Sequence, residues 1–158
     1  MDFTIRFANK NDMKAVHDLI VELAIYEREE EQVEVTIADL QRDGFAKHPR
    51  FKVLVAEADT KIIGMALFYE RYSTWKGKAI HLEDLIVTES KRNTGVGKAL
   101  YTELMEYAEA HNYGRVAWEV LDWNKNAIDF YENSGARVLD AWRVVHMSKE
   151  NLKKYIRE

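Results

Sequence analysis

Two neighbouring segments of the sequence combine residue types that could carry out chemistry. The first is a pair of carboxylates, Glu83-Asp84, inside an apolar stretch; a carboxylate can accept a proton from an amine or hold a cation. The second is Arg92-x-x-Gly95-x-Gly97, which follows that stretch and precedes a helical pattern. Glycine permits positive φ angles, so successive N–H groups can point at one anion beside the positive end of a helix. A pyrophosphate suits such a turn, and an ordinary tight turn is the alternative.

The spacing of this turn excludes the two best-known phosphate-binding motifs. A P-loop requires Gly-x-x-x-x-Gly-Lys-Ser/Thr, but here the first glycine is missing and Ala99 follows Lys98. The dinucleotide motif Gly-x-Gly-x-x-Gly also fails, because Leu100 takes the place of the third glycine. The turn therefore indicates a pyrophosphate site of another class.

The strand that carries the two carboxylates changes phase. Ile80 and Leu82 fall on even positions, whereas Leu85 and Val87 fall on odd ones. Because strand side chains alternate between faces, one extra residue at Glu83-Asp84, a β-bulge, would restore the phase. A strand buried on both faces is the alternative. The bulge would place two carboxylates where the sheet opens and would leave backbone groups for a ligand.

The apolar spacing of the whole chain predicts the elements that position these residues. The predicted strands are the alternation Phe3, Ile5, Phe7, the hairpin pair Val53–Ala58 and Ile62–Tyr69, then Ala79–Thr88, Val116–Leu121 and Val138–Met147. The predicted helices follow Asn11 or Asp12, run from Thr36 to Gly44, Gly97 to His111 and Asn126 to Ser134, and follow Ser148. The order β-α-α-β-β-β-α-β-α-β-α predicts an α/β (mixed α+β) fold, with a mixed sheet and helices on both faces. We expect a single domain over residues 1–158.

Composition excludes several classes of function. The chain has 158 residues and a formal net charge of -4, which argues against nonspecific binding to nucleic acid. It has no cysteine, so disulfides, thiolate metal sites and a cysteine nucleophile are excluded, and a cytoplasmic location is expected. No apolar run is long enough to cross a membrane. The five histidines lack metal-ligand spacing, and we expect no metal.

An acidic run over residues 27–34 allows two interpretations. It holds five glutamates, with Arg28 as the only opposing charge. It is either a solvated loop or helix end, or a mouth that attracts a polycation. Composition does not choose between these interpretations.

The turn and several other segments of the chain resemble the GNAT superfamily of N-acetyltransferases. Arg92, Gly95 and Gly97 match its acetyl-CoA signature, Arg/Gln-x-x-Gly-x-Gly/Ala. Further segments resemble the diamine (spermidine/spermine) N-acetyltransferases: Glu22–Glu27, Asp43–Pro49, Leu82–Val87, and Trp123-Asn124 with Phe130-Tyr131, Gly135-Ala136 and Trp142-Arg143. The resemblance implies the strongly twisted sheet of that superfamily, acetyl-CoA as co-substrate, a small-molecule amine as partner and a homodimer.

The resemblance also implies roles for individual residues. It assigns the pantetheine arm of the cofactor to the backbone of Leu85, Ile86 and Val87. It assigns the pyrophosphate to Arg92, Asn93, Thr94, Gly95, Val96, Gly97 and Lys98. It assigns the region of the thioester to Asn124 and Ala127. It assigns the amine to Tyr26, Glu27, Trp75, Glu83 and Asp84, and protonation of the departing CoA thiolate to Tyr131. Two features depart from the family pattern: Glu132-Asn133 replaces basic residues after Tyr131, and the turn at Asp59-Thr60 is short.

The expected reaction is acetyl transfer to a primary amine by direct attack, because no cysteine can form an acyl-enzyme. Glu83, through water, is the candidate for accepting the ammonium proton; Asp84 could serve instead, or could bind the cation. A free backbone N–H at the bulge is the expected oxyanion donor. Tyr131 is either the acid or a packing residue three positions from Ile128. The alternatives are a GNAT enzyme acting on protein or aminoglycoside amines, and a sensor that binds acetyl-CoA or polyamine without turnover.

Overall fold

The computed structural model describes residues 1–157 and divides them into two units. The first unit is Met1–Glu119, and the second begins at Val120.

The first unit is built on a five-stranded mixed sheet. Its strands are β1 (Thr4–Phe7), β2 (Lys52–Ala58), β3 (Lys61–Ser73), β4 (Gly77–Val87) and β5 (Val116–Ala117), and its helices are α1 (Met13–Glu27), α2 (Ile37–Gly44) and α3 (Val96–Ala110). The strands lie side by side in the order of the sequence. β1 to β4 are antiparallel, and β5 is parallel to β4. The predicted mixed sheet is confirmed.

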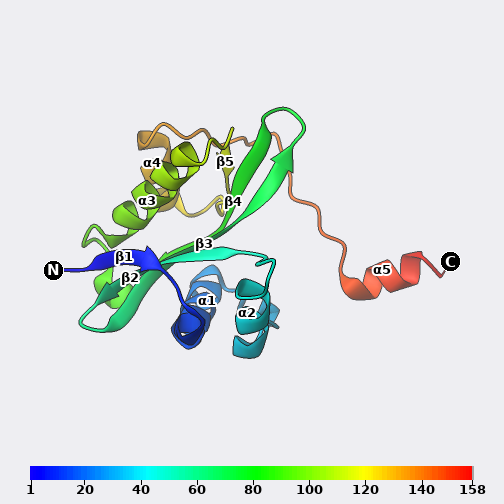
Figure 1. Cartoon of the computed structure of the whole chain (residues 1–158). Helices are drawn as coiled ribbons and strands as arrows, with labels where there is room; N and C mark the ends of the chain where they lie inside the picture. The colour runs from blue at the N-terminus through cyan, green and yellow to red at the C-terminus, as the bar shows by residue number, and fades with distance from the viewer. Residues whose placement is uncertain (158) are drawn as a thin grey trace. The chain divides into compact units, whose positions relative to one another are not determined.

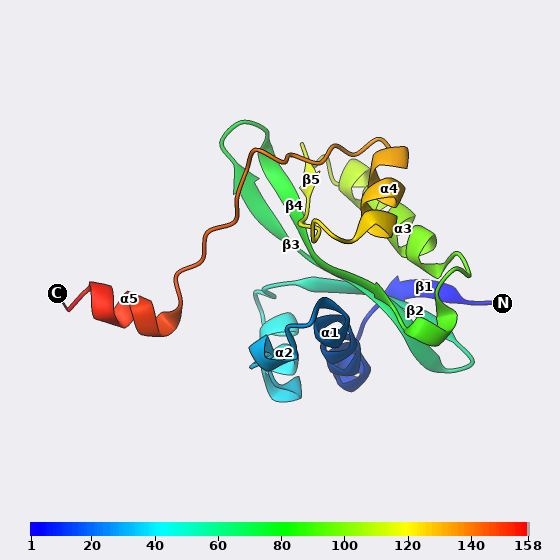
Figure 2. The same ribbon diagram turned by 180° about the vertical axis from the view of Figure 1, so that it is seen from behind.

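Helices cover both faces of this sheet (Figure 1), with α1 and α2 on one face and α3 on the other. The alternation of strand side chains explains the two cores. Leu54 and Ala56 join the core beneath α3, whereas Val53 and Val55 join the core beneath α1 and α2. Figure 2, seen from behind, shows the same arrangement around the long β3–β4 hairpin.

The local signals for two helices are confirmed in position, but they act differently. Thr36 caps α2 with a capping box: its hydroxyl accepts from the Asp39 N–H, and Asp39 accepts from the Thr36 N–H. Asp12 stands at the N-cap of α1, yet its side chain makes no cap bond there. A short 3₁₀ turn, Lys10–Asp12, precedes α1, and Asn9 caps that turn instead.

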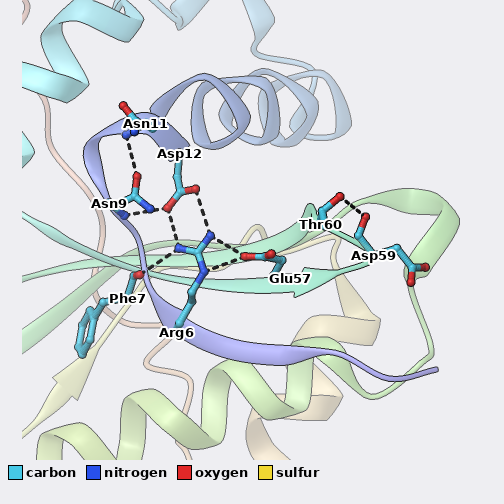
Figure 3. A network of polar contacts seen from close by, with 8 residues as sticks. All are labelled: Arg6, Phe7, Asn9, Asn11, Asp12, Glu57, Asp59 and Thr60. Carbon is cyan, nitrogen blue, oxygen red and sulfur yellow. Dashed lines mark hydrogen bonds and ion pairs between the residues drawn. The ribbon is translucent and has the colours of Figure 1, made fainter.

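The carboxylate of Asp12 is held by an arginine on β1 (Figure 3). Arg6 donates to Asp12 Oδ2 from Nη1 at 2.7 Å and to Glu57 Oε2 on β2 from Nε at 2.8 Å. The Arg6 guanidinium keeps the pKa of Asp12 below its ordinary value. This network joins β1, β2 and the start of α1.

The second unit contains α4 (Lys125–Asn133) and α5 (Lys149–Tyr155). Gly135, with φ 95°, follows α4, and Ser148 caps α5 by accepting from the Asn151 N–H. The helix predictions for this region are confirmed within a residue or two.

Two strand predictions in the C-terminal part are corrected. The strand expected over Val116–Leu121 is only the two residues of β5, and residues 138–147 form no strand. A strand exists only where another strand supplies its hydrogen bonds, and the sheet found within residues 1–157 does not include residues 138–147. Most of their apolar side chains are exposed; Val145 is 89% exposed and Trp142 is 69% exposed.

Candidate active site

The predicted β-bulge is present in β4. Across the β3–β4 ladder, Leu67 faces Asp84 and Phe68 faces Leu82, so Glu83 is the extra residue between two successive pairs. The phase change between Leu82 and Leu85 in the sequence has this as its physical cause. The bulge presents two adjacent acidic residues, Glu83 and Asp84, to the same region of the unit.

Three carboxylates act on one another around the bulge. Asp84 is partly buried, and burial, together with the charges of Glu83 and Glu27, raises its pKa to about 7. Glu27 is the last residue of α1, and burial and the charge of Glu29 raise its pKa. Like charges in a partly desolvated place are unfavourable on their own. The arrangement therefore favours a positively charged ligand.

Glu83 is held by side chains that the sequence reasoning did not identify. The Tyr69 hydroxyl donates to Glu83 Oε2 at 2.9 Å, and His81 Nε2 lies 3.4 Å from the same oxygen. Arg71 Nη1 lies 3.1 Å from His81 Nδ1. A guanidinium can only donate, so Nδ1 accepts and the ring proton stands on Nε2, toward Glu83. Burial and the bond to Glu83 raise the pKa of Tyr69 to about 12, which keeps its hydroxyl a donor.

The register of the hairpin explains this cluster. Tyr69 faces His81 directly across the ladder, and Glu83 follows His81 by two residues on the same strand. The sequence reasoning ended the third strand at Tyr69 and did not derive its pairing, so it missed the contact. Pairing the residues of β3 and β4 outward from the turn at residues 74–76 places Tyr69 opposite His81 and would have predicted the contact.

The acidic run lies at the C-terminal end of α1. Residues 25 and 28–32 line a hollow of about 350 Å³ there, with Glu29, Glu30 and Glu31 on its wall. The C-terminal end of a helix carries partial negative charge from its last carbonyls, and the glutamates add to it. This negative charge around a hollow favours the interpretation of the acidic run as a mouth that attracts cations.

The outer edge of β4 beyond the bulge is the place expected for the pantetheine arm. The ladder between β4 and β5 consists of the pairs Ile80–Val116 and His81–Ala117, while β4 continues to Val87. An extended ligand can add to such an edge as a strand. Leu85, Ile86 and Val87, the residues expected there, lie on this stretch.

The glycine turn has the backbone conformation that anion binding requires. Asn93 has φ 61° and Gly95 has φ 89°, and residues 93–95 are exposed. Gly95 is the N-cap of α3 and has no side chain to cap it. The first N–H groups of a helix have no partner within the helix. The turn from Asn93 to Lys98 thus ends at the positive end of a fifteen-residue helix.

Two of the residues expected at the amine site lie in different places. Tyr26 is in α1, beside Glu27, and its ring lies 4.9 Å beneath the Arg92 guanidinium. Trp75 is in the turn of the β3–β4 hairpin. The ladder from Gly77 to Glu83 spans roughly 20 Å at the usual rise per residue, so within this chain the hairpin does not bring Trp75 to the carboxylates.

The residues expected near the thioester belong to the second unit. Asn124 is the N-cap of α4, and its Oδ1 accepts from the Ala127 N–H at 3.3 Å. Tyr131 is partly buried in the second turn of the same helix, and its ring meets that of Phe130 edge-on at 5.5 Å. Glu83 belongs to the first unit and Tyr131 to the second, and the approach of one to the other stays a prediction.

Within residues 1–157, no group of three or more His, Asp or Glu side chains is arranged to hold a metal ion. None of the helices in that range combines the length and apolar character needed to cross a bilayer.

Residues 13–136 match the model of the Acetyltransferase (GNAT) family. The chain belongs to this family. GNAT enzymes use acetyl-CoA, and this one is an acetyl-CoA-dependent N-acetyltransferase.

This GNAT enzyme has curated relatives along nearly its whole length. It is 34% identical to the thialysine N-epsilon-acetyltransferase of Bos taurus, over 94% of each chain. It is 32% identical to the spermidine/spermine N(1)-acetyltransferase-like protein 1 of Homo sapiens, over 95% of this chain and 23% of that protein. Among solved structures, an integron cassette protein from the mobile metagenome of V. cholerae has a TM-score of 0.80 at 24% identity, over 100% of this chain and 99% of the other. That likeness shows the fold.

Proposed function

We propose that this N-acetyltransferase acetylates the primary amine of a small polycationic substrate: a diamine, a polyamine or a thialysine-like amino acid. The observation that carries the proposal is the convergence of Glu27, Glu83 and Asp84 at the β4 bulge, beside the acidic end of α1. The names of relatives that act on thialysine support the same class of substrate.

Deprotonation of the substrate is the first task of the site. An alkylammonium with a pKa near 10.4 is only about one part in 2500 deprotonated at pH 7, a deficit of about 4.6 kcal/mol. Glu83, through a water molecule, accepts this proton and passes it to solvent. Tyr69 and His81 both approach Oε2 of Glu83, which leaves its other oxygen for that exchange. Asp84 holds the ammonium group, and its raised pKa makes it the alternative acceptor.

The amine nitrogen then attacks the thioester carbonyl, and the carbon–sulfur bond breaks. A backbone N–H of the bulge stabilises the charge that develops on the carbonyl oxygen. Tyr131 gives its proton to the departing thiolate and recovers one from the acylated nitrogen. With a thiol pKa near 8.5 and a tyrosine pKa near 10, the transfer to the thiolate costs about 2 kcal/mol, which the proton recovered from the strongly acidic acylated nitrogen offsets. The products are the N-acetyl amine, the free thiol and the proton released at the start.

The cofactor contacts are also part of the proposal. The edge of β4 at Leu85, Ile86 and Val87 takes the pantetheine arm, and Asn93 to Lys98 take the pyrophosphate. Arg92, whose guanidinium lies against Glu22 and Tyr26, supports the start of that turn. The positive φ angles of Asn93 and Gly95 at the head of α3 support this assignment. Asn124 and Ala127, at the head of α4, take the region of the thioester.

A homodimer completes the proposal. Residues 138–147 expose several apolar side chains, including Val144, Val145 and Met147. Such a surface supports contact with a second copy of the chain. Light scattering of the eluting protein measures the mass directly. The mass of a dimer is expected, and the mass of a monomer at enzyme-assay concentration rejects this part.

The decisive experiment for substrate class is release of free thiol from acetyl-CoA with a panel of amines: spermidine, putrescine, thialysine, lysine, an aminoglycoside and a histone-tail peptide. Turnover with spermidine, putrescine or thialysine, weakened by Glu83→Gln but not by Glu103→Gln on the exposed face of α3, supports the proposal. Activity confined to the aminoglycoside or the peptide replaces the substrate class. Binding of acetyl-CoA without any turnover replaces the enzyme by a sensor.

A further inference from the structure

Helix α1 is tied to the connection between β4 and α3 by one carboxylate, that of Glu22. The Thr88 hydroxyl donates to Glu22 Oε2 at 2.9 Å, and the Glu89 N–H donates to Oε1 at 2.7 Å. The partners are 66 and 67 residues away in the sequence. Both oxygens of a side chain that is 32% exposed are thereby engaged with the first two residues after β4.

Arg92 strengthens the same attachment. Its Nε donates to the Val87 carbonyl at 3.1 Å, its Nη2 lies 3.9 Å from Glu22 Oε1, and its guanidinium stands 4.9 Å over the ring of Tyr26. The arginine of the glycine motif thus faces back toward β4 and α1. Its charge lies against a carboxylate and an aromatic face of α1.

The place of these contacts gives them functional weight. Immediately after Arg92, Asn93 and Gly95 adopt positive φ angles in an exposed turn. An array of N–H groups binds an anion well only if it is ordered beforehand, because ordering a loop on binding consumes binding free energy. The anchored residues 88–92 fix where that turn begins.

The sign of the charge makes the role specific. A carboxylate near an anion site opposes anion binding by direct electrostatics. Any favourable contribution of Glu22 to binding a pyrophosphate must therefore come through the backbone that it holds, which is the signature of positioning rather than contact.

We propose that Glu22 is a positioning residue that orders the β4–α3 connection for the pyrophosphate of acetyl-CoA. The proposal rests on the function proposed above for that turn.

The test compares two acetyl donors, acetyl-CoA and S-acetylpantetheine, of which only the first carries a pyrophosphate. For Glu22→Ala, the KM of acetyl-CoA is expected to rise roughly tenfold, the effect of losing charge-assisted hydrogen bonds. The kcat at saturating acetyl-CoA and the kcat/KM for S-acetylpantetheine are expected to stay within about twofold of the wild type. Glu22→Gln keeps one acceptor oxygen for the Glu89 N–H and presents an NH2 donor to the Thr88 hydroxyl, which can accept as well as donate, so it is expected to restore part of the affinity.

Two further variants guard the conclusion. Asp18→Ala removes a carboxylate one turn earlier on α1, where it pairs with Lys14 at the surface, and is expected to leave the kinetic constants for both donors unchanged. Thr88→Val removes one donor to Glu22 with little change of shape and is expected to raise the KM of acetyl-CoA about threefold.

Equal losses with both donors, or no change in KM for Glu22→Ala and Thr88→Val, overturn the positioning role. If Glu22→Ala does not fold, the Thr88→Val result alone decides in the same way. If the wild type turns over no amine, calorimetric Kd values for CoA and pantetheine replace the KM values. The positioning role and the substrate proposal can therefore fail independently.

Discussion

The half-buried carboxyl of Asp84 should lower the stability of the enzyme as the pH rises. Its pKa is raised from 3.8 to about 7, first by burial and then by the charges of Glu83 and Glu27. Between these two pH values the folded protein keeps a proton that the unfolded chain has released. The free energy of unfolding therefore falls from about pH 4 to about pH 7, and the whole penalty, on the order of 4 kcal/mol, is present above that range.

Asp84→Asn removes this charge while keeping the size of the side chain. At pH 8.5 the variant is expected to be more stable than the wild type by about 2 to 4 kcal/mol, the lower figure allowing for relaxation of the site. At pH 4 the difference should shrink to within about 1 kcal/mol, because the wild-type carboxyl is protonated in the folded state. Urea denaturation at half-unit pH steps measures the difference curve.

Two matched variants sharpen the result. Glu83→Gln removes the larger of the two charges that raise the pKa of Asp84, so it should flatten the pH dependence of the wild type. Glu27→Gln removes one source of repulsion and should flatten the pH dependence of the wild type. A variant Asp84→Asn that is no more stable than wild type at pH 8.5, or whose advantage is the same at pH 4, refutes the reasoning about this site.

Three further predictions concern the acid, the turn and the fold. Tyr131→Phe is expected to lower kcat at least about 100-fold with little change in CoA affinity; Tyr155→Phe on exposed α5 is the control, and a kcat near that of wild type removes Tyr131 as the acid. Gly95→Ala places a Cβ at φ 89° in open space and is expected to weaken CoA binding by calorimetry, through about 1 kcal/mol of backbone strain; an unchanged Kd contradicts the role of the turn. Arg6→Met leaves the little-exposed carboxylate of Asp12 without its cation, and urea denaturation at pH 7 is expected to show that the free energy of unfolding falls by about 2 to 3 kcal/mol. A fall below about 0.5 kcal/mol would mean that the network contributes no more than an ordinary surface ion pair.

The features that the sequence predicted well are those with local causes. The helix that begins after Thr36 depends on a cap formed within four adjacent residues, and the turn at Asp59-Thr60 depends on two. The bulge at Glu83 could be predicted because an extra residue shifts the apolar alternation of the strand that contains it.

The features that it missed depend on distant partners. Residues 138–147 have the alternation of a strand, but a strand also needs a neighbour to receive its hydrogen bonds. The contact between Glu22 and Thr88 joins two elements across 66 residues, and no local pattern announces it. Tyr69 and His81 meet through the register of a hairpin longer than the apolar pattern indicated.

The central claim, acetyl transfer to a small polycationic amine at the β4 bulge, is tested most directly by mass spectrometry of the product formed from acetyl-CoA and either thialysine or spermidine. The account predicts a singly N-acetylated amine and an equal amount of free CoA thiol, with Asp84→Asn raising the KM of the amine and leaving that of acetyl-CoA unchanged. A KM of the amine that is unchanged in Asp84→Asn, or acetylation that occurs only on a peptide or an aminoglycoside, would contradict it.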